Sequence, residues 1–144
     1  MKIVFVCRGN VGRSQMAEAL LRKMKPDLTI TSAGTTVVNA PSGDKSGVAL
    51  DSFDGGRMVI EVLKEARADA SHKTRVQLTE EMLTDADRII VMAEKDKIPD
   101  YLLNDPRMIY WQLADPMKTS IEGHRATRDE IQKLLENNIA LFTA

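Results

Sequence analysis

Residues 2–14 read KIVFVCRGNVGRS, and this stretch decides which fold the chain adopts. Its first half is a continuous apolar run rich in β-branched residues, which is typical of a strand buried on both faces of a parallel sheet. Two glycines and an asparagine follow, and the apolar residues from there to Met24 recur at the spacing of one helix face. Ser14 is the expected N-cap of that helix. The stretch therefore predicts a strand, a tight loop and a helix in direct succession.

The rest of the chain continues the alternation of strands and helices. Strand patterns recur at Leu28–Gly34, Asp87–Ala93 and Met108–Trp111. Helix patterns lie at Arg57–Arg67, at Leu78–Leu83 with Thr79 as its cap, and at Thr127–Phe142. Such alternation predicts right-handed βαβ units. We therefore expect an α/β fold in one domain over residues 1–144, a three-layer sandwich with a four-stranded parallel sheet flanked by helices on both faces. Ligands of such sheets bind beyond the carboxyl ends of the strands, where Cys7 lies.

Composition limits the partners and the compartment. The 144 residues hold 20 Lys and Arg against 21 Asp and Glu, so the chain lacks the basic surface of proteins that bind nucleic acid or anionic membranes. One cysteine forms no internal disulfide, and with two histidines it is too few for a Cys/His zinc site of about four ligands. The apolar run Ile3–Val6 is far shorter than a signal peptide or a membrane span. We expect a cytoplasmic monomer without metal, cofactor, nucleic acid or membrane.

The loop after the first strand carries the candidate chemistry. Its backbone N–H groups, together with the positive end of the following helix, predict a cradle for a phosphate group built from Arg8, Gly9, Asn10, Val11, Gly12 and Ser14. Gly9 and Gly12 can adopt positive φ, and Asn10 tolerates the left-handed region. An anion pocket with a guanidinium favours the thiolate, so Cys7 is the candidate nucleophile. Arg13 offers a planar fork for two phosphoryl oxygens, and Ser14 can donate to the sulfur.

Other interpretations of the loop explain less. A lone cysteine behind a strand is commonly a small core residue, but that interpretation leaves the glycine loop and Arg13 without a role. A dinucleotide site requires a third glycine, and a nucleotide P-loop requires four residues between its glycines and a lysine after the second. Here two residues separate Gly9 and Gly12, and Arg13 follows. Neither alternative accounts for Cys7.

The segment Cys7–Ala19, CRGNVGRSQMAEA, resembles the N-terminal signature of the low-molecular-weight protein tyrosine phosphatases and the related thioredoxin-dependent arsenate reductases. Ser32–Thr35, Ser71–Arg75 and Asp115-Pro116 are similar to later landmarks of this family, in the same order. The resemblance implies a metal-independent, two-step hydrolysis of a phosphomonoester. It also implies that Asp115 is the general acid, and that Asn10, Ser32 and His72 are linked by hydrogen bonds beneath the loop.

The chain departs from the family at several places. Many members carry a second cysteine where this chain has Gly12, and the tyrosine phosphatases usually have an aromatic residue where it has Met117. Residues 35–51 contain no aromatic residue, although Tyr110 and Trp111 could reach the cleft. Arg8 on the rim could favour substrates with a second negative charge. His124 is expected in the solvated start of the last helix.

Three functions remain open at this point. The first is a phosphatase acting on a phosphorylated protein or a small phosphate ester. The second is an arsenate reductase, which would need an external thiol or redox protein because DADRIIVMAEKD lacks the additional cysteines of the family's reductases. The third is a phosphate-binding module without turnover, against which the presence of Cys7, Arg13, Ser14 and Asp115 together argues.

Overall fold

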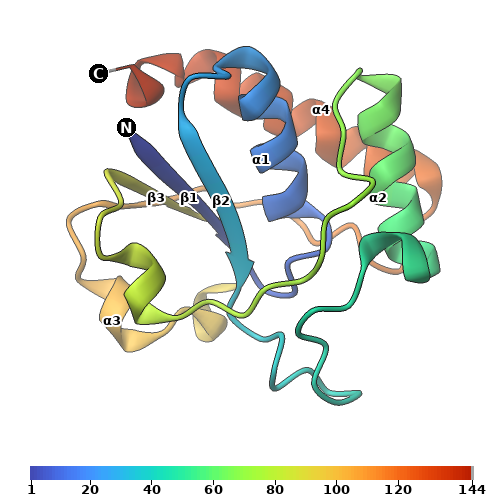
Figure 1. Cartoon of the computed structure of the whole chain (residues 1–144), viewed down its shortest axis with the longest axis horizontal. Helices are drawn as coiled ribbons and strands as arrows, with labels where there is room; N and C mark the ends of the chain where they lie inside the picture. Colours follow the sequence, from blue (N-terminus) through green and yellow to red (C-terminus); the bar gives the residue numbers. More distant parts are fainter. Residues whose placement is uncertain (144) are drawn as a thin grey trace.

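A four-stranded parallel sheet forms the centre of the molecule. The computed structural model describes residues 1–143. The strands are β1 (Lys2–Cys7), β2 (Thr29–Gly34), β3 (Arg88–Val91) and β4 (Met108–Tyr110). They lie in the order β2-β1-β3-β4, and all neighbours run parallel (Figure 1). The α/β class and the four-stranded parallel sheet predicted from the sequence are confirmed.

Helices cover the two faces unequally. The long helices α1 (Arg13–Met24), α2 (Asp54–Glu65) and α4 (Ile121–Asn137) pack on one face, where Ile3 and Phe5 of β1 point. The short helix α3 (Asp100–Leu103) and the 3₁₀ turn Glu80–Leu83 cover the other face, toward which Val4 and Val6 point (Figure 1). Both faces of β1 are fully buried, which is why its sequence is a continuous apolar run. Among residues 1–143, no helix has both the length and the apolar character needed to cross a membrane.

Several helix boundaries differ from the sequence prediction. Helix α1 begins at Arg13 with Gly12 as its N-cap, because the Ser14 hydroxyl contacts Cys7 instead of capping the helix. Helix α2 begins at Asp54, and its first turn includes Gly55 and Gly56, which are poor helix formers.

The start of the last helix and the 3₁₀ turn before β3 also differ. Helix α4 begins at Ile121, six residues before the predicted start, and the Ser120 side chain caps it by accepting from the Gly123 N–H. The helix ends at Asn137, and Ile139–Phe142 form a separate 3₁₀ turn. Thr79 precedes Glu80–Leu83 but makes no side-chain cap bond.

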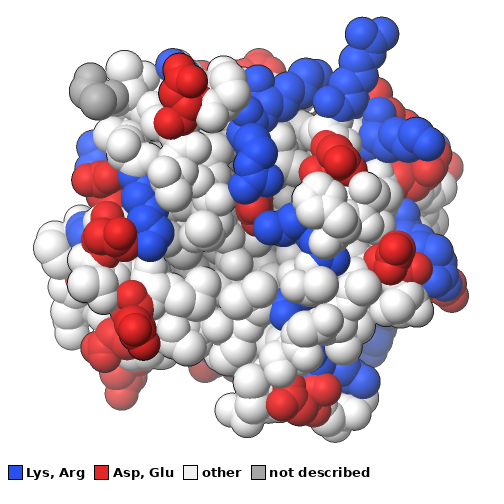
Figure 2. Space-filling view, in the orientation of Figure 1, with Lys and Arg blue, Asp and Glu red and all other residues white. Residues whose placement is uncertain are grey.

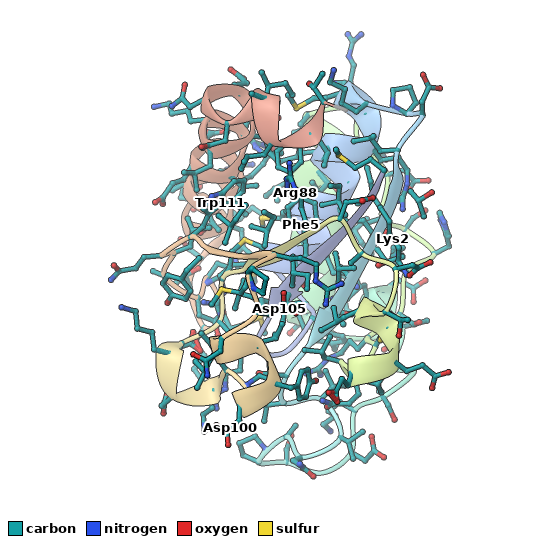
Figure 3. All side chains as sticks on the ribbon, turned by 90° about the vertical axis from the view of Figure 1, so that its left-hand side faces the viewer. Lys2, Phe5, Arg88, Asp100, Asp105 and Trp111 are labelled. Atoms are coloured by element: carbon teal, nitrogen blue, oxygen red, sulfur yellow. The ribbon has the colours of Figure 1, made fainter. Side chains whose placement is uncertain are left out.

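Trp111 belongs to the core, and the neighbouring Tyr110 is half-buried against the second core cluster. The Trp111 ring packs against Phe5 and Phe142, with centroid separations of 6.4 and 6.3 Å (Figure 3). The Tyr110 hydroxyl donates to the Ala93 carbonyl oxygen over 3.0 Å. The suggestion that these two rings could reach the cleft is therefore wrong.

His124 is 1% exposed, so its predicted solvated position is also wrong. Its Nδ1 lies 3.0 Å from the Ser120 carbonyl oxygen, which can only accept, so Nδ1 carries the proton and donates. Packing of the first turn of α4 against the preceding segment buries this ring.

Candidate active site

Cys7 lies at the carboxyl end of β1, on the floor of the loop. It is 2% exposed. The Thr35 N–H donates to the Cys7 carbonyl oxygen over 2.9 Å, and the Thr36 N–H donates to that of Arg8 over 2.8 Å. A Cβ on Gly34 would lie 2.8 Å from both the Arg8 oxygen and the Asn10 nitrogen, so glycine is required there for the loop to approach β2. Since α1 starts at Arg13, its positive end faces this loop.

Asn10, and neither glycine of the loop, adopts the left-handed conformation. Its φ is 55°, whereas neither Gly9 nor Gly12 uses the positive φ that glycine can adopt. The two glycines instead permit close approach. A Cβ on Gly12 would lie 3.0 Å from Pro116 Cγ, and a Cβ on Gly9 would lie 3.3 Å from Arg75 Nη2. These two positions therefore admit the Asp115-Pro116 segment and Arg75 to the site.

Two donors point at the Cys7 sulfur. The Asn10 backbone N–H donates over 3.3 Å, and Ser14 Oγ lies 3.0 Å away. The Asn10 side-chain amide donates to Ser14 Oγ over 2.8 Å, so this oxygen accepts one bond and its own proton is directed to the sulfur. The orientation of that amide follows from the Val76 N–H, which donates to Asn10 Oδ1 over 2.8 Å. Donors to sulfur favour its anionic form.

A buried hydrogen-bond chain supports this arrangement from below. The Asn10 side chain also donates to Ser32 Oγ over 3.1 Å, and Ser32 Oγ donates to Glu18 over 2.6 Å. Glu18 is 2% exposed, and its charge is balanced by Arg22 at 2.6 Å and Lys73 at 2.9 Å. Because every member has a partner, the chain holds Asn10 and Ser14 in fixed positions under the sulfur.

His72 lies outside this network, so its predicted place there is wrong. Its side chain is 77% exposed and lies 3.8 Å from Asp69. The neighbouring Lys73 turns inward and reaches Glu18 instead, because a buried carboxylate requires a cation. Lys73 and Arg22 line a basic cleft of about 620 Å³ between α1 and the segment after α2. Figure 2 shows Lys and Arg side chains gathered over this part of the molecule.

Arg13 is held rigidly beside the sulfur. It is 2% exposed, and its Nη1 donates to the carbonyl oxygens of Met92 at 2.7 Å and Leu113 at 3.1 Å. Glu94 pairs with the same nitrogen at 2.8 Å. Burial opposes the charge of Arg13, but Cys7, Glu94 and Asp115 together raise its pKa above the ordinary value. The guanidinium is therefore permanently charged and fixed.

Glu94 was not predicted from the sequence. Burial opposes its ionisation, but the hydrogen bond from Arg13 holds the pKa of Glu94 below its usual value, so it is a carboxylate. It lies in the loop that follows β3, and loops at the carboxyl ends of parallel strands meet at one edge of the sheet. The position of Glu94 directly after β3 was therefore the sequence feature that could have identified it as a site residue.

Asp115 brings a carboxyl group to the same pocket. Its Oδ2 lies 3.7 Å from Arg13 Nη2, and its Oδ1 accepts from the Met117 N–H over 3.0 Å. The pocket has a volume of about 460 Å³, and its walls include Cys7, Arg13 and Asp115. The predicted cradle divides into two groups. Arg8, Gly9, Val11 and Gly12 line the pocket, whereas Asn10 and Ser14 are fully buried beneath it.

A cysteine on the floor of a loop at the carboxyl end of a strand, with a fixed guanidinium and a carboxyl group at the same pocket, is the arrangement expected of a cysteine-dependent phosphatase on an α/β fold. Comparison with protein families agrees with this geometry. The family described as low molecular weight phosphotyrosine protein phosphatase matches residues 2–142, and the chain belongs to this family.

Named relatives cover nearly the whole chain. The chain is 33% identical to a protein-arginine-phosphatase from Geobacillus stearothermophilus, over 94% of this chain and 91% of the relative. It is 29% identical to a probable low molecular weight protein-tyrosine-phosphatase, EpsP, from Ralstonia nicotianae, over 91% of this chain and 88% of the relative. A solved structure described as an arsenate reductase in the phosphate binding state superposes with a TM-score of 0.77 at 26% identity, covering 99% of this chain and 98% of that one. The chain is thus similar both to protein phosphatases and to an arsenate reductase.

Oxidation of Cys7 is expected to be poorly reversible. Cys7 is the only cysteine of the chain, and Gly12 occupies the loop position where many family members have a second cysteine. A sulfenic acid at Cys7 therefore has no internal thiol to condense with. Excess peroxide should drive it to sulfinic and sulfonic acid, which mass spectrometry of the Cys7 peptide detects, and later thiol should restore only part of the activity. Glutathione present during oxidation is the control, since it should protect by forming a mixed disulfide. Full recovery by late thiol without a mixed disulfide would contradict this expectation.

Proposed function

We propose that the protein hydrolyses phosphomonoesters in two steps through a phosphocysteine intermediate. The Cys7 thiolate attacks phosphorus, the bond from phosphorus to the leaving oxygen breaks, and Asp115 gives that oxygen its proton. Asp115, now a carboxylate, takes a proton from water, and the resulting hydroxide attacks phosphorus. Phosphate is released and the Cys7 thiolate is regenerated. The observation that carries the proposal is that Cys7, Arg13 and Asp115 line one pocket.

The surrounding residues have separate roles in this mechanism. Arg13 binds two phosphoryl oxygens and holds them as phosphorus flattens, because its contacts to Met92 and Leu113 fix its plane. Ser14 donates to the sulfur, which favours the thiolate before attack and its departure in the second step. Asn10 and Ser32 position Ser14 and the loop.

The substrate we propose is a phosphorylated protein, with a small phosphate ester as the alternative. The relatives named above are protein phosphatases. Beyond the loop, the uncharged wall residues are Thr36, Ala40, Pro41, Ser42 and Met117, none of which is aromatic. A phenyl ring would therefore lack aromatic stacking partners among these residues. Both phosphotyrosine, a phosphomonoester, and phosphoarginine, a phosphoramidate, are therefore included as substrates. With phosphoarginine the bond from phosphorus to nitrogen would break, and Asp115 would give its proton to the leaving nitrogen.

Replacement of Asp115 by Asn tests the acid role. We expect kcat for phenyl phosphate to fall by about 10²-fold, because the poor leaving group needs the proton. The loss for p-nitrophenyl phosphate should be smaller, since that leaving group is already acidic. Glu94→Gln is the matched control, because it removes a nearby carboxylate that contacts Arg13 but would donate no proton to substrate. Equal losses for the two esters in Asp115→Asn would exclude the acid role.

Arsenate reduction is the second candidate, supported by the similarity to the reductase structure. Cys7 would displace hydroxide from arsenate to form a thiol–arsenate adduct. An external thiol would then attack the Cys7 sulfur, leaving arsenite and a mixed disulfide, and a second thiol would restore Cys7 as the two external thiols become a disulfide. Arsenite formation that depends on added thiol, without phosphatase turnover, would favour this activity. Affinity for phosphate without any product would favour a binding module.

The proposal also covers the oligomeric state and the cellular compartment of the protein. We propose that the protein acts as a monomer in the cytoplasm, on phosphate or arsenate groups and without nucleic acid, membrane or cofactor. Its single cysteine suits a reducing compartment.

A further inference from the structure

Four cationic side chains surround the mouth of the catalytic pocket. Arg8 follows β1, Lys45 lies in the long loop after β2, Arg75 lies in the segment between α2 and β3, and Lys118 follows β4. These segments meet beyond the carboxyl ends of the strands (Figure 1). Arg13 is buried deeper in the pocket than these four side chains and is the residue proposed to bind the phosphoryl group. The four outer cations are therefore additional to it. We call them the rim cations.

The rim cations have no carboxylate partner. Among residues 1–143, none of the four lies within 4 Å of an Asp or Glu oxygen. Arginines elsewhere on the molecule do pair, such as Arg107 with Asp105 at 2.7 Å and Arg125 with Glu65 at 2.7 Å. The one carboxylate that lines the pocket, Asp115, faces Arg13. Five cationic side chains, the rim cations and Arg13, therefore line the pocket against the single carboxylate Asp115, which leaves an excess of positive charge at its mouth.

Arg75 is fixed in place with part of its guanidinium unused. Its Nε donates to the Gly9 carbonyl oxygen over 3.0 Å, and its Cζ lies 5.8 Å from the centroid of the Phe53 ring. Burial lowers the pKa of Arg75, while the charge of Cys7 opposes that shift, which places the guanidinium within the field of the nucleophile. Its Nη1 and Nη2 have no hydrogen-bond acceptor among residues 1–143. Donors held at a pocket wall without acceptors are suited to an oxyanion of a ligand.

Lys118 occupies a backbone conformation that disfavours it. Its φ is 67°, a region where glycine or asparagine costs less than a lysine. Backbone strain of this kind clusters at functional sites. Lys118 lies three residues after Asp115, at the wall of the same pocket.

We propose that the rim cations form a recognition site for acidic groups, so that the preferred substrates are phosphorylated protein segments with Asp or Glu on both sides of the phosphorylated residue. This inference rests on the proposed phosphatase function. The four cations come from four different segments that line the same pocket, so acidic residues before and after the phosphorylated residue can each find a cation there. Opposite charge also steers substrate to the mouth, an effect that salt weakens.

Matched phosphopeptides test the proposal. Two series, of phosphotyrosine and of phosphoarginine, carry two Glu, two Gln or two Lys on each side of the phosphorylated residue. In whichever series is turned over, kcat/KM should fall in the order Glu, Gln, Lys, by about tenfold or more from first to last, since each exposed pair contributes ~2–5-fold. The difference in kcat/KM between the Glu and Lys peptides should become smaller when NaCl is raised from about 0.05 to about 0.5 M, because salt screens the charges. A small bisphosphate ester preferred over the Glu peptides would assign the rim cations to small anions and overturn the protein-segment proposal.

Removal of charge from the rim cations is the second test of the proposal. The double variant Lys45→Gln/Lys118→Gln should lose most of the preference for Glu peptides, measured as the ratio of kcat/KM for the Glu peptides to kcat/KM for the Lys peptides. Lys133→Gln is the control, since this exposed lysine of α4 lies far along the chain from every rim cation and outside the pocket walls. It should keep the full preference. Equal kcat/KM for Glu and Lys peptides, or an unchanged preference in the double variant, would overturn the proposal.

A binding measurement separates this inference from the proposed function. Fluorescence anisotropy of the labelled peptides on Cys7→Ser protein needs no turnover, and the Glu peptides should bind about tenfold more tightly than the Lys peptides. If the wild type hydrolyses neither the phosphopeptides nor the small esters but this order of affinity holds, the phosphatase proposal fails and the acidic preference stands. If esters are hydrolysed without any effect of charge on affinity, the rim proposal alone fails.

Discussion

Cys7→Ser protein is expected to lose at least about 10⁴-fold in kcat for p-nitrophenyl phosphate, the largest loss of any single change considered. At neutral pH a serine hydroxyl is a weak nucleophile unless a base takes its proton. The groups around Cys7 are the Asn10 N–H and the Ser14 hydroxyl, which donate to an anion and remove no proton from a neutral hydroxyl. Steady-state assays of freshly purified protein measure the loss.

A binding assay and a melting curve make this result specific. Cys7→Ser should retain affinity for phosphate within a few fold, because Arg13 and the loop remain, and its thermal midpoint should stay close to that of the wild type. A phosphoenzyme trapped by rapid acid quench should carry its label on Cys7 in the wild type. Equal activity of Cys7→Ser and wild type would remove the nucleophile from the mechanism.

Arg13→Lys is expected to lower kcat/KM by about 10³-fold while the protein stays folded. Arg13 bonds at the same time to the Met92 and Leu113 carbonyl oxygens and to Glu94, and it has further N–H groups left for substrate. A lysine ammonium has three donors at a single point, so it cannot satisfy these partners and grip two phosphoryl oxygens as well. Because Arg13→Lys preserves the positive charge, the fall in kcat/KM measures the contribution of the planar guanidinium geometry.

The matched control for Arg13→Lys is Glu94→Gln. It removes the carboxylate that pairs with Arg13 but leaves an oxygen to accept its hydrogen bond, so a loss of about tenfold or less is expected. Circular dichroism and thermal unfolding establish that both variants fold. If Arg13→Lys kept more than about a third of the wild-type kcat/KM, bidentate binding of the phosphoryl group by Arg13 would be excluded.

Local sequence pattern was sufficient for the sheet and for the position of the candidate nucleophile Cys7 at the carboxyl end of β1. The run Ile3–Val6 identifies a strand buried on both faces, and the loop that follows places Cys7 at a carboxyl end. Helix starts were less predictable where glycines occupy the first turn. At Gly56 a Cβ would lie 2.0 Å from the Leu50 carbonyl oxygen, so glycine there permits close packing, and tertiary contact overrides its low helix propensity.

Contacts between distant segments decided the rest of the site. The sequence by itself determined the parallel α/β fold, the loop and the candidates Cys7, Arg13 and Asp115, because periodicity and short motifs are properties of neighbouring residues. Only the tertiary structure decided that Lys73 and not His72 reaches Glu18, and that Glu94 fixes Arg13. Residues 72 and 73 are both polar and adjacent, and nothing local determines which one turns inward. A buried carboxylate 55 residues away in the sequence makes that choice, because its charge must be balanced by a cation.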